Sequence, residues 1–143
     1  MITVRHVLHQ KGNQVFSAGP DTFVFDALRL MSEKNVGALL VLEKGNLIGI
    51  FSERDYARKV ILKGKSSRET VVQEIMTANP FTVKPDQNIR ECLEVMTHRQ
   101  IRHLPVLDGG KLVGVISIGD AVKSIIEDQK DTINKLKTYI TGR

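Results

Sequence analysis

The chain has 143 residues and a net charge of +5, and 41% of its residues are apolar, 5% aromatic and 26% charged. This length suits one compact domain or two small repeats, and the apolar share is enough to build a hydrophobic core. A single cysteine excludes an intramolecular disulfide framework and zinc sites made of several thiolates. No apolar run approaches the roughly 18–20 residues of a membrane span, and the N-terminus lacks a signal-peptide stretch. We therefore expect a cytoplasmic protein without a membrane segment.

The basic excess is concentrated in one segment. Residues 54–68 hold six lysine and arginine side chains and one aspartate, so this segment alone carries the net charge of the whole chain. Such a cluster can attract phosphate groups or nucleic acid, although an isolated basic run is more often a solvated helix face. Nucleic-acid binding stays open as an alternative function. No aromatic platform and no helix-turn-helix, RRM or KH signature accompanies the cluster.

The chain contains an internal repeat. A shift of 65 residues aligns residues 16–56 with residues 81–121 without a gap, and 13 of the 41 aligned positions are identical. Many of the other pairs are conservative, such as Val36 with Ile101. Two copies of one folding unit are the simplest explanation.

The first copy predicts strand, helix, hairpin and helix in that order. After a short helix over residues 4–10, an extended stretch at 15–17 leads through Pro20-Asp21 into a helix with apolar residues at helical spacing. Two apolar runs at 38–42 and 47–51 flank a Gly-Asn connection and predict a hairpin. A second helix follows near residues 55–62.

The second copy repeats this order after a polar linker at residues 63–68 and a short helix over 70–76. Its expected strands lie at 81–83, 104–107 and 112–116, the last two joined through Asp-Gly. Pro105 cannot donate to a strand ladder, so its strand should lie at a sheet edge or begin there. The fold class is therefore α/β (α+β), with two pseudo-symmetric β-α-β-β-α repeats. The expected boundaries are residues 4–68 for repeat 1, 72–131 for repeat 2 and 132–143 for a C-terminal helical extension.

The last helix is longer than its counterpart in the first copy. It should start near Asp120 and run to about Ile140. A seam with alternating steps of four and three contains Val122, Ile126, Gln129, Ile133, Leu136 and Ile140. This spacing is heptad-like, with one polar interruption at Gln129. The seam could pack on its own chain or on a second subunit, and we favour a homodimer.

Both hairpins end in the same motif. The first copy reads Gly49-Ile-Phe-Ser52-Glu-Arg-Asp55 and the second reads Gly114-Val-Ile-Ser117-Ile-Gly-Asp120. Ser-x-x-Asp at a helix start is close to a capping box, which needs no ligand. The same corner can also bind one, because free N–H groups and a hydroxyl suit an anion and a carboxylate suits a sugar diol. Its occurrence in both copies favours a nucleoside phosphate as ligand.

With these features the sequence resembles a pair of cystathionine-β-synthase (CBS) domains, a Bateman module, over residues 4–131. The resemblance rests on the tandem unit, the two Ser-x-x-Asp endings, the phrase Glu74-Ile-Met-Thr77 and the run Arg102-His-Leu-Pro-Val106. It implies two halves packed through their sheets, with adenosine-type ligands (AMP, ADP, ATP, S-adenosylmethionine or NAD) in clefts between them. It also implies a regulatory, non-catalytic module that senses energy or metabolic state, and it leaves open a regulatory subunit that acts on an effector protein.

In this family each cleft joins the Ser/Asp corner of one repeat to strands of the other. Carried over, cleft A would contain Ser52, Asp55, Thr82, Val83, Arg102, His103 and Pro105. Cleft B would contain Ser117, Asp120, Ser17, Gly37, Ala38 and Leu39.

The two implied clefts differ in charge. Arg102-His103 takes the positions of Gly37-Ala38, and Arg54 and Arg58, four apart on one helix face, add cations to cleft A. Guanidinium groups suit phosphate, so we expect a phosphate-bearing ligand in cleft A with Asp55 on its ribose diol. Cleft B should bind more weakly or more permissively. His103 has a second interpretation as a residue at the core edge bonded to backbone.

Catalysis and metal binding have little support in the sequence. There is no Gly-x-Ser-x-Gly elbow, no phosphate-binding Gly-rich loop and no His-Glu-x-x-His. Cys92 occupies an apolar helix position and is expected to be a buried, unreactive thiol. The four histidines have no acidic or thiol partners at metal-ligand spacing. We predict neither catalytic residues nor metal ligands.

Overall fold

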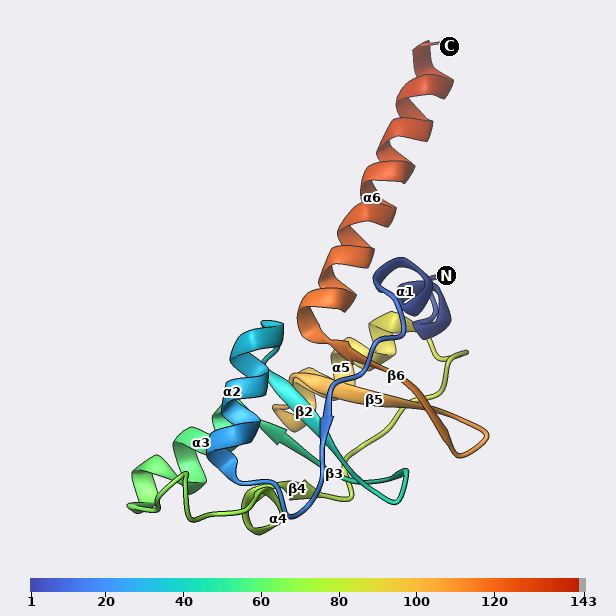
Figure 1. The fold of residues 1–143 in the computed structure, drawn as a ribbon. Coiled ribbons are helices and arrows are strands. Elements are labelled where there is room, and N and C mark those ends of the chain that lie inside the picture. Colours follow the sequence, from blue (N-terminus) through green and yellow to red (C-terminus); the bar gives the residue numbers. More distant parts are fainter. Residues whose placement is uncertain (142–143) are drawn as a thin grey trace. The chain divides into compact units, whose positions relative to one another are not determined.

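A computed structural model describes residues 1–141, which form two compact units (Figure 1). The first-repeat unit comprises Gln14–Thr82. The second-repeat unit comprises Met1–Asn13 together with the chain from Val83 onward. Each unit has its own cluster of buried apolar side chains, so each repeat has a separate core.

The first-repeat unit is a four-stranded sheet with helices. Its elements are β1 (Ser17–Ala18), α2 (Val24–Lys34), β2 (Ala38–Glu43), β3 (Asn46–Ser52), α3 (Glu53–Lys59), the 3₁₀ turn η1 (Ile61–Lys63), α4 (Val72–Ile75) and β4 (Thr77–Ala78). The strand order is β1-β2-β3-β4, with β1 parallel to β2 and the other neighbours antiparallel. The expected strand, helix, hairpin and helix are confirmed.

The second-repeat unit is built around one hairpin. Its elements are α1 (Val4–Lys11), α5 (Ile89–Arg99), β5 (His103–Asp108), β6 (Lys111–Ser117) and α6 (Ile118–Thr141). Strands β5 and β6 form a two-stranded antiparallel sheet, so Pro105 lies in an edge strand as predicted.

The strand expected at residues 81–83 shrinks to a single bridge between Val83 and Val106. In the first repeat the N–H of Leu40 donates to the carbonyl of Phe16 at 3.2 Å. The shift of 65 residues puts Pro105 at the position of Leu40, and proline has no N–H to donate. The second repeat therefore lacks the hydrogen bond that would lengthen this strand.

Both hairpins form where the sequence predicts them, but each turn differs by one residue from the predicted Gly45-Asn46 and Asp108-Gly109. Lys44 and Gly45 have φ angles of 52° and 81°, and Gly109 and Gly110 have φ angles of 59° and 83°. Two consecutive positive φ angles are the geometry of a type I′ turn, which matches the twist of the strands that it joins.

Each short leading helix packs in the unit of the other repeat. Val4 and Val7 of α1 are buried in the second-repeat core, and Val72 and Ile75 of α4 are buried in the first-repeat core. The backbone repeats the same connection, with Thr3 bridged to Asn88 and Val71 bridged to Phe23. The compact units are therefore not contiguous stretches of the sequence repeats.

The motif glycines make room for these leading helices. A Cβ atom on Gly49 would lie 2.4 Å from Sδ of Met76, and one on Gly114 would lie 2.7 Å from Cδ2 of Leu8. Both glycines are buried within the second strand of their hairpin. The glycine of each Gly-h-h-Ser-x-x-Asp ending (h, apolar) therefore has a packing function next to the candidate site.

The predicted linker at residues 63–68 folds onto the first-repeat unit. The N–H of Phe25 donates to the carbonyl of Ser67 at 2.9 Å, and the guanidinium of Arg68 lies 4.0 Å from the centroid of the Phe25 ring. This segment holds α3 and η1 near the start of α2, so in the structure it belongs to one compact unit.

Candidate functional site

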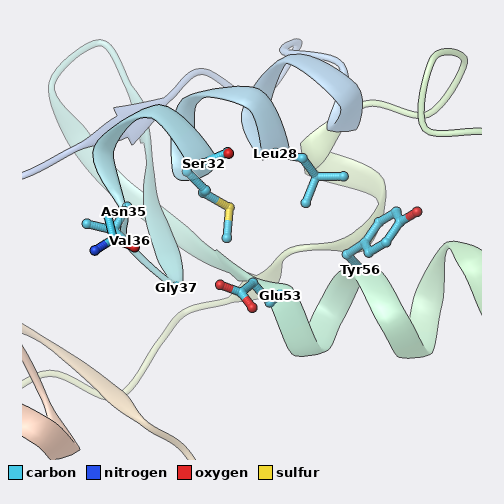
Figure 2. A pocket seen from close by; sticks show the side chains of 8 residues that line it. Leu28, Ser32, Asn35, Val36, Gly37, Glu53 and Tyr56 are labelled. Carbon is cyan, nitrogen blue, oxygen red and sulfur yellow. The ribbon is translucent and has the colours of Figure 1, made fainter.

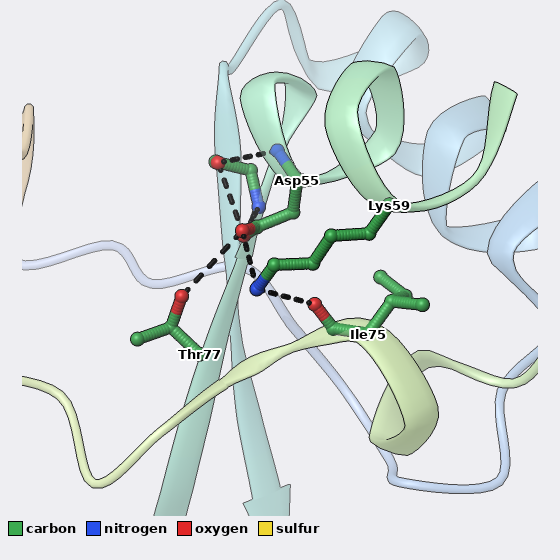
Figure 3. Close-up of polar contacts among 5 residues, drawn as sticks. Asp55, Lys59, Ile75 and Thr77 are labelled. Atoms are coloured by element: carbon green, nitrogen blue, oxygen red, sulfur yellow. Dashed lines mark hydrogen bonds and ion pairs between the residues drawn. The ribbon is translucent and has the colours of Figure 1, made fainter. Parts of the chain in front are cut away.

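The first Ser/Asp corner is a capping box at the start of α3 (Figure 3). The N–H of Ser52 donates to Oδ2 of Asp55 at 2.9 Å, and the hydroxyl of Ser52 donates to the same oxygen at 3.1 Å. The N–H of Asp55 donates back to Oγ of Ser52 at 3.2 Å. Asp55 is buried, so the protein holds this carboxylate in a fixed orientation at a helix N-terminus.

A lysine and a threonine complete the first corner. Nζ of Lys59 lies 3.1 Å from Oδ1 of Asp55 and donates to the carbonyl of Ile75, also at 3.1 Å. The hydroxyl of Thr77 donates to Oδ1 of Asp55 at 3.5 Å. The buried carboxylate is thus neutralised by a cation from one turn further along the same helix.

The second corner at the start of α6 repeats this geometry. The N–H of Ser117 donates to Oδ2 of Asp120 at 2.9 Å, and the N–H of Asp120 donates to Oγ of Ser117 at 3.1 Å. The cation here comes from α1: Nζ of Lys11 lies 2.6 Å from Oδ2 of Asp120 and donates to the carbonyl of Val115 at 2.8 Å. Both corners therefore combine a serine, an aspartate and a lysine, although different elements supply the lysine.

The second corner also perturbs two titratable groups. Burial by itself would raise the pKa of Asp120, but the hydrogen bonds from Lys11 and Ser117 and the charge of Lys11 outweigh it, and the pKa lies below its usual value. Burial lowers the pKa of His103; the charges of Lys11 and Arg102 lower it further, while Asp120 opposes them. These directions favour an ionised Asp120 beside a neutral His103 at pH 7.

Within each unit the hairpin register brings further predicted residues to the corner. His103 pairs with Ser117, and Ala38 pairs with Ser52. Directly opposed residues of antiparallel strands point to the same face. Each corner therefore shares a sheet face with the first residue of its own hairpin. His103 therefore shares a face with the second corner, whereas the sequence analysis placed it in cleft A with the first corner.

Several other predicted residues lie at the edges of the same strands. Ser17 pairs with Leu40, next to Leu39 on β2, and the N–H of Glu53 donates to the carbonyl of Gly37 at 3.1 Å. In the second repeat the N–H of Ile118 donates to the carbonyl of Arg102 at 3.0 Å. In each repeat, a backbone hydrogen bond therefore joins the residue before the first hairpin strand to the first residue of the helix that follows the hairpin.

The predicted phosphate-binding cations differ in accessibility. Arg58 and Arg102 are exposed and Arg54 is partly buried. Val83, an apolar residue predicted for cleft A, is buried. The composite clefts A and B each draw residues from both compact units, as Thr82 ends one unit and Val83 opens the other. They remain predictions.

A pocket of about 580 Å³ lies beside the first corner (Figure 2). It is lined by the C-terminal half of α2, the following turn and the start of α3. Its residues are Leu28, Met31, Ser32, Asn35, Val36, Gly37, Glu53 and Tyr56. Gly37 is the one predicted site residue in this lining. Glu53 contributes a carboxylate to this lining.

Two residues that line this pocket, Glu53 and Tyr56, are replaced by apolar residues in the second repeat. The shift of 65 residues puts Ile118 at the position of Glu53 and Ala121 at that of Tyr56, and both pack on the second-repeat core. At these two positions the second repeat therefore lacks the polar groups that line the pocket.

Three site residues escaped the sequence analysis. Lys59 could have been found, because a lysine four residues after Asp55 lies on the same helix face. Thr77 is the last residue of the Glu74-Ile-Met-Thr77 motif, which indicates the family but not the contact with Asp55. Lys11 carried no signal, because its contact with Asp120 spans 109 residues.

Cys92 is buried as expected, and burial, with the negative charge of Glu91, raises its pKa to about 11. Among residues 1–141 no group of three histidine, cysteine, aspartate or glutamate side chains is placed to hold a metal ion. No helix within that range is long and apolar enough to cross a membrane.

Comparison with known proteins identifies the family. A model described as the CBS domain matches residues 1–62 and 72–127. The mitochondrial CBS domain-containing protein CBSX3 of Arabidopsis thaliana is 36% identical, over 98% of this chain and 72% of the relative. A solved CBS-domain protein of Burkholderia ambifaria is 51% identical, with a TM-score of 0.86 over 90% of this chain and 96% of the other.

A more distant structural neighbour is an oligomer. The hexameric CBS-CP12 protein of bloom-forming cyanobacteria is 27% identical, with a TM-score of 0.76 over 85% of this chain and 70% of the other. The matched ranges, the duplicated hairpins and the shared fold agree with one another. The chain belongs to the CBS-domain family and carries two CBS domains.

Proposed function

We propose that this protein is a regulatory, non-catalytic module that binds an adenosine-type nucleotide (AMP, ADP, ATP or NAD) at its two Ser/Asp corners. The observation that carries the proposal is the matching construction of both corners. In each, a carboxylate is fixed by the N–H of the serine, and a lysine ammonium lies within 3.1 Å of the carboxylate. A capping box alone requires no such cation, whereas a sugar–phosphate ligand can use both groups.

The chemistry of each corner fits a nucleoside phosphate. A carboxylate accepts hydrogen bonds from the two hydroxyls of a ribose, and the N-terminus of a helix favours an anion. Lys59 and Lys11 then have a role in both the ligand-free and the ligand-bound protein. Each ammonium neutralises its aspartate when the diol is absent and becomes available to phosphate oxygens when the diol engages the carboxylate. The Lys11–Asp120 pair is partly exposed, so this exchange has a modest cost.

We retain the composite clefts of the sequence analysis as part of the proposal. Cleft A joins the first corner to residues 82–83, 102–103 and 105, and cleft B joins the second corner to residues 17 and 37–39. The pairing of His103 with Ser117 adds a feature, because it places an imidazole on the face of the second corner, while Lys59 and Lys11 supply the cations of the two corners. Ligand that bridges two repeats would shift their packing and so bias a surface read by an effector protein.

The proposal also includes an oligomeric state and a cellular location. The hexameric relative supports self-association, and we propose a homodimer for this chain. We propose a cytoplasmic location. Fractionation of cells that produce a tagged protein tests that location, with a mitochondrial location, as in the Arabidopsis relative, as the contrary result.

Titration of Asp55 variants tests nucleotide binding. Asp55→Asn retains a cap acceptor but removes the charge, and we expect AMP, ATP or NAD to bind about ten- to a hundredfold more weakly. Asp26→Asn is the matched control, because Asp26 is an exposed aspartate in the same unit. Asp55→Ala and Asp120→Ala separate the two corners. Unchanged affinity in every Asp55 and Asp120 variant would overturn the proposal, and mass spectrometry of nucleotide released from the purified protein identifies the ligand.

A further inference from the structure

Helix α6 continues far beyond the second-repeat core. Ala121, Ser124 and Ile125 are buried at its start, whereas every residue from 126 to 141 is exposed. Figure 1 shows the helix projecting away from the strands and helices of its own unit. An isolated helix of about this length is marginal in water, so a helix that leaves its domain generally needs a partner.

The exposed stretch carries an apolar seam with heptad spacing. Ile126, Ile133 and Ile140 occupy a positions, while Val122, Gln129 and Leu136 occupy d positions. The apolar members of this seam are all 40–80% exposed in the single chain. Isoleucine at a with leucine at d favours two parallel strands, and the seam has isoleucine at all three a positions and leucine at one d position, Leu136.

Charges beside the seam also select an orientation. The e positions are lysines: Lys123, Lys130 and Lys137. The g positions are uncharged: Ile125, Thr132 and Tyr139. A parallel pair sets each e position against a g position of the other helix, so lysine meets an uncharged side chain. An antiparallel pair sets the two lysine rows against each other, and like charges repel.

The polar residue of the seam points to the same orientation. In a parallel pair in register, Gln129 meets the same glutamine of the second copy, and each amide can donate to and accept from the other. In an antiparallel pair of the same length, Gln129 lies opposite Ile133, which leaves an amide buried without a partner.

We propose that residues 122–140 of α6 form a parallel two-stranded coiled coil with α6 of a second copy of this chain. The inference deepens the homodimer of the proposed function by naming its surface and orientation, and it is independent of nucleotide binding. Its occupant is a second copy because the lysine rows, the isoleucine positions and the self-pairing glutamine all suit an identical helix.

Light scattering on the full chain without nucleotide tests the surface. Wild-type protein is expected at twice the 16.0 kDa mass of one chain. Ile133→Glu puts a charge at the centre of the seam and should weaken dimerisation at least tenfold, whereas Asn134→Glu, on the outer face, should leave it unchanged. Ile133 is half exposed in the single chain, so the change leaves the folded unit intact. A monomeric wild type, or an Ile133→Glu dimer as stable as wild type, overturns the proposal.

Nucleotide titration of the same variant separates the two proposals. Ile133→Glu is expected to bind AMP, ATP or NAD with wild-type affinity while being monomeric. A monomer that binds nucleotide normally supports the coiled coil and the binding corners together. A dimeric wild type that binds no nucleotide at any corner defeats the binding function and leaves the coiled coil standing.

Cross-linking tests the orientation. Ile140→Cys should form an intermolecular disulfide on mild oxidation, because a parallel pair brings the two cysteines into one layer of the seam. In an antiparallel pair the same positions lie about 27 Å apart along the helix axis. Thr138→Cys, on the outer face, is the matched control, and Cys92 is buried and does not compete. Equal cross-linking of the two variants, or none in Ile140→Cys, rejects the parallel arrangement.

Discussion

The ammonium of Lys11 lies 2.6 Å from Oδ2 of Asp120, although the two residues are 109 positions apart in the chain. In the other corner, Lys59 does the same for Asp55 from four residues away. One corner is therefore neutralised by local helical spacing and the other by the packing of α1 into the second-repeat unit. This difference makes the second corner sensitive to changes at the N-terminus.

Removal of the Lys11 cation should reduce stability in a pH-dependent way. The pKa of Asp120 lies below its usual value in the folded protein, so the ionised group stabilises the fold above pH of about 3.9, and this contribution is lost as the pH falls through the lower folded value. Lys11→Met should cost about 1 kcal/mol at pH 7, because the pair is only partly buried. Urea unfolding of both proteins between pH 2 and pH 7 measures the cost.

The pH dependence of the difference in unfolding free energy between wild type and Lys11→Met shows whether the ion pair is responsible for it. The gap between wild type and Lys11→Met should narrow below pH 4 and close once the pH falls below the lowered pKa of Asp120 in the folded wild type. Lys84→Met removes an exposed lysine of the same unit and should show no such gap. A gap that is constant with pH would mean that Lys11 acts through its aliphatic stem and the bond to Val115.

His103 should report the charges of the second corner. Burial, Lys11 and Arg102 lower its pKa and Asp120 raises it. Lys11→Met should therefore raise the pKa of His103, and Asp120→Asn should lower it further. NMR titration of the imidazole measures both shifts, and two shifts of the same sign would contradict this account.

The lowered pKa of His103 also affects the pH dependence of stability. A half-buried neutral histidine such as His103 stabilises the fold fully above its unfolded pKa of about 6.5, and the contribution falls as the pH drops toward the folded value. Stability of the wild type should therefore begin to decline below pH 6.5, before the carboxylates protonate. His103→Gln should flatten this part of the unfolding profile.

Alanine at the motif glycines should destabilise the two repeats unequally. A Cβ on Gly49 would meet Met76 and also the backbone carbonyl of Thr77 at 3.0 Å, whereas one on Gly114 would meet only the flexible end of Leu8. We expect Gly49→Ala to cost about 2–3 kcal/mol and Gly114→Ala about 1–2 kcal/mol. Thermal unfolding measures both.

A third glycine provides the control for this series. Gly19 has no positive φ angle, and the nearest atom to its Cβ position, Oγ1 of Thr22, is 3.8 Å away. Gly19→Ala should be neutral or slightly stabilising, since alanine restricts the unfolded chain. Equal losses in all three variants would show that backbone entropy, and not contact with the leading helices, governs these positions.

Cys92 should be inert in the folded protein. Its pKa of about 11 leaves almost no thiolate at pH 8, and the side chain is 1% exposed. A thiol reagent such as Ellman's reagent should therefore react only at the rate of unfolding, and fully once urea is added. Rapid labelling of the native protein would contradict the burial of this helix face.

Local patterns in the sequence determined the repeat, the hairpins and both capped corners. The Lys44-Gly45 and Gly109-Gly110 turns and the Ser-x-x-Asp spacing act over two to four residues, so backbone geometry alone dictates them. The burial of Cys92 followed from helical periodicity in the same way. Sequence could also have shown the ion pair of Lys59 with Asp55, because it joins one helix turn to the next.

Tertiary structure alone decided which unit each leading helix joins and which lysine reaches Asp120. Helix α1 packs with the second repeat and α4 with the first, and the close approach of Leu8 to Gly114 allows that packing. The apolar pattern of residues 4–11 predicts a helix with a buried face, but it does not indicate which repeat that face packs against. The choice depends on shape complementarity between segments that are distant in the chain, such as those of Leu8 and Gly114, which local spacing does not encode.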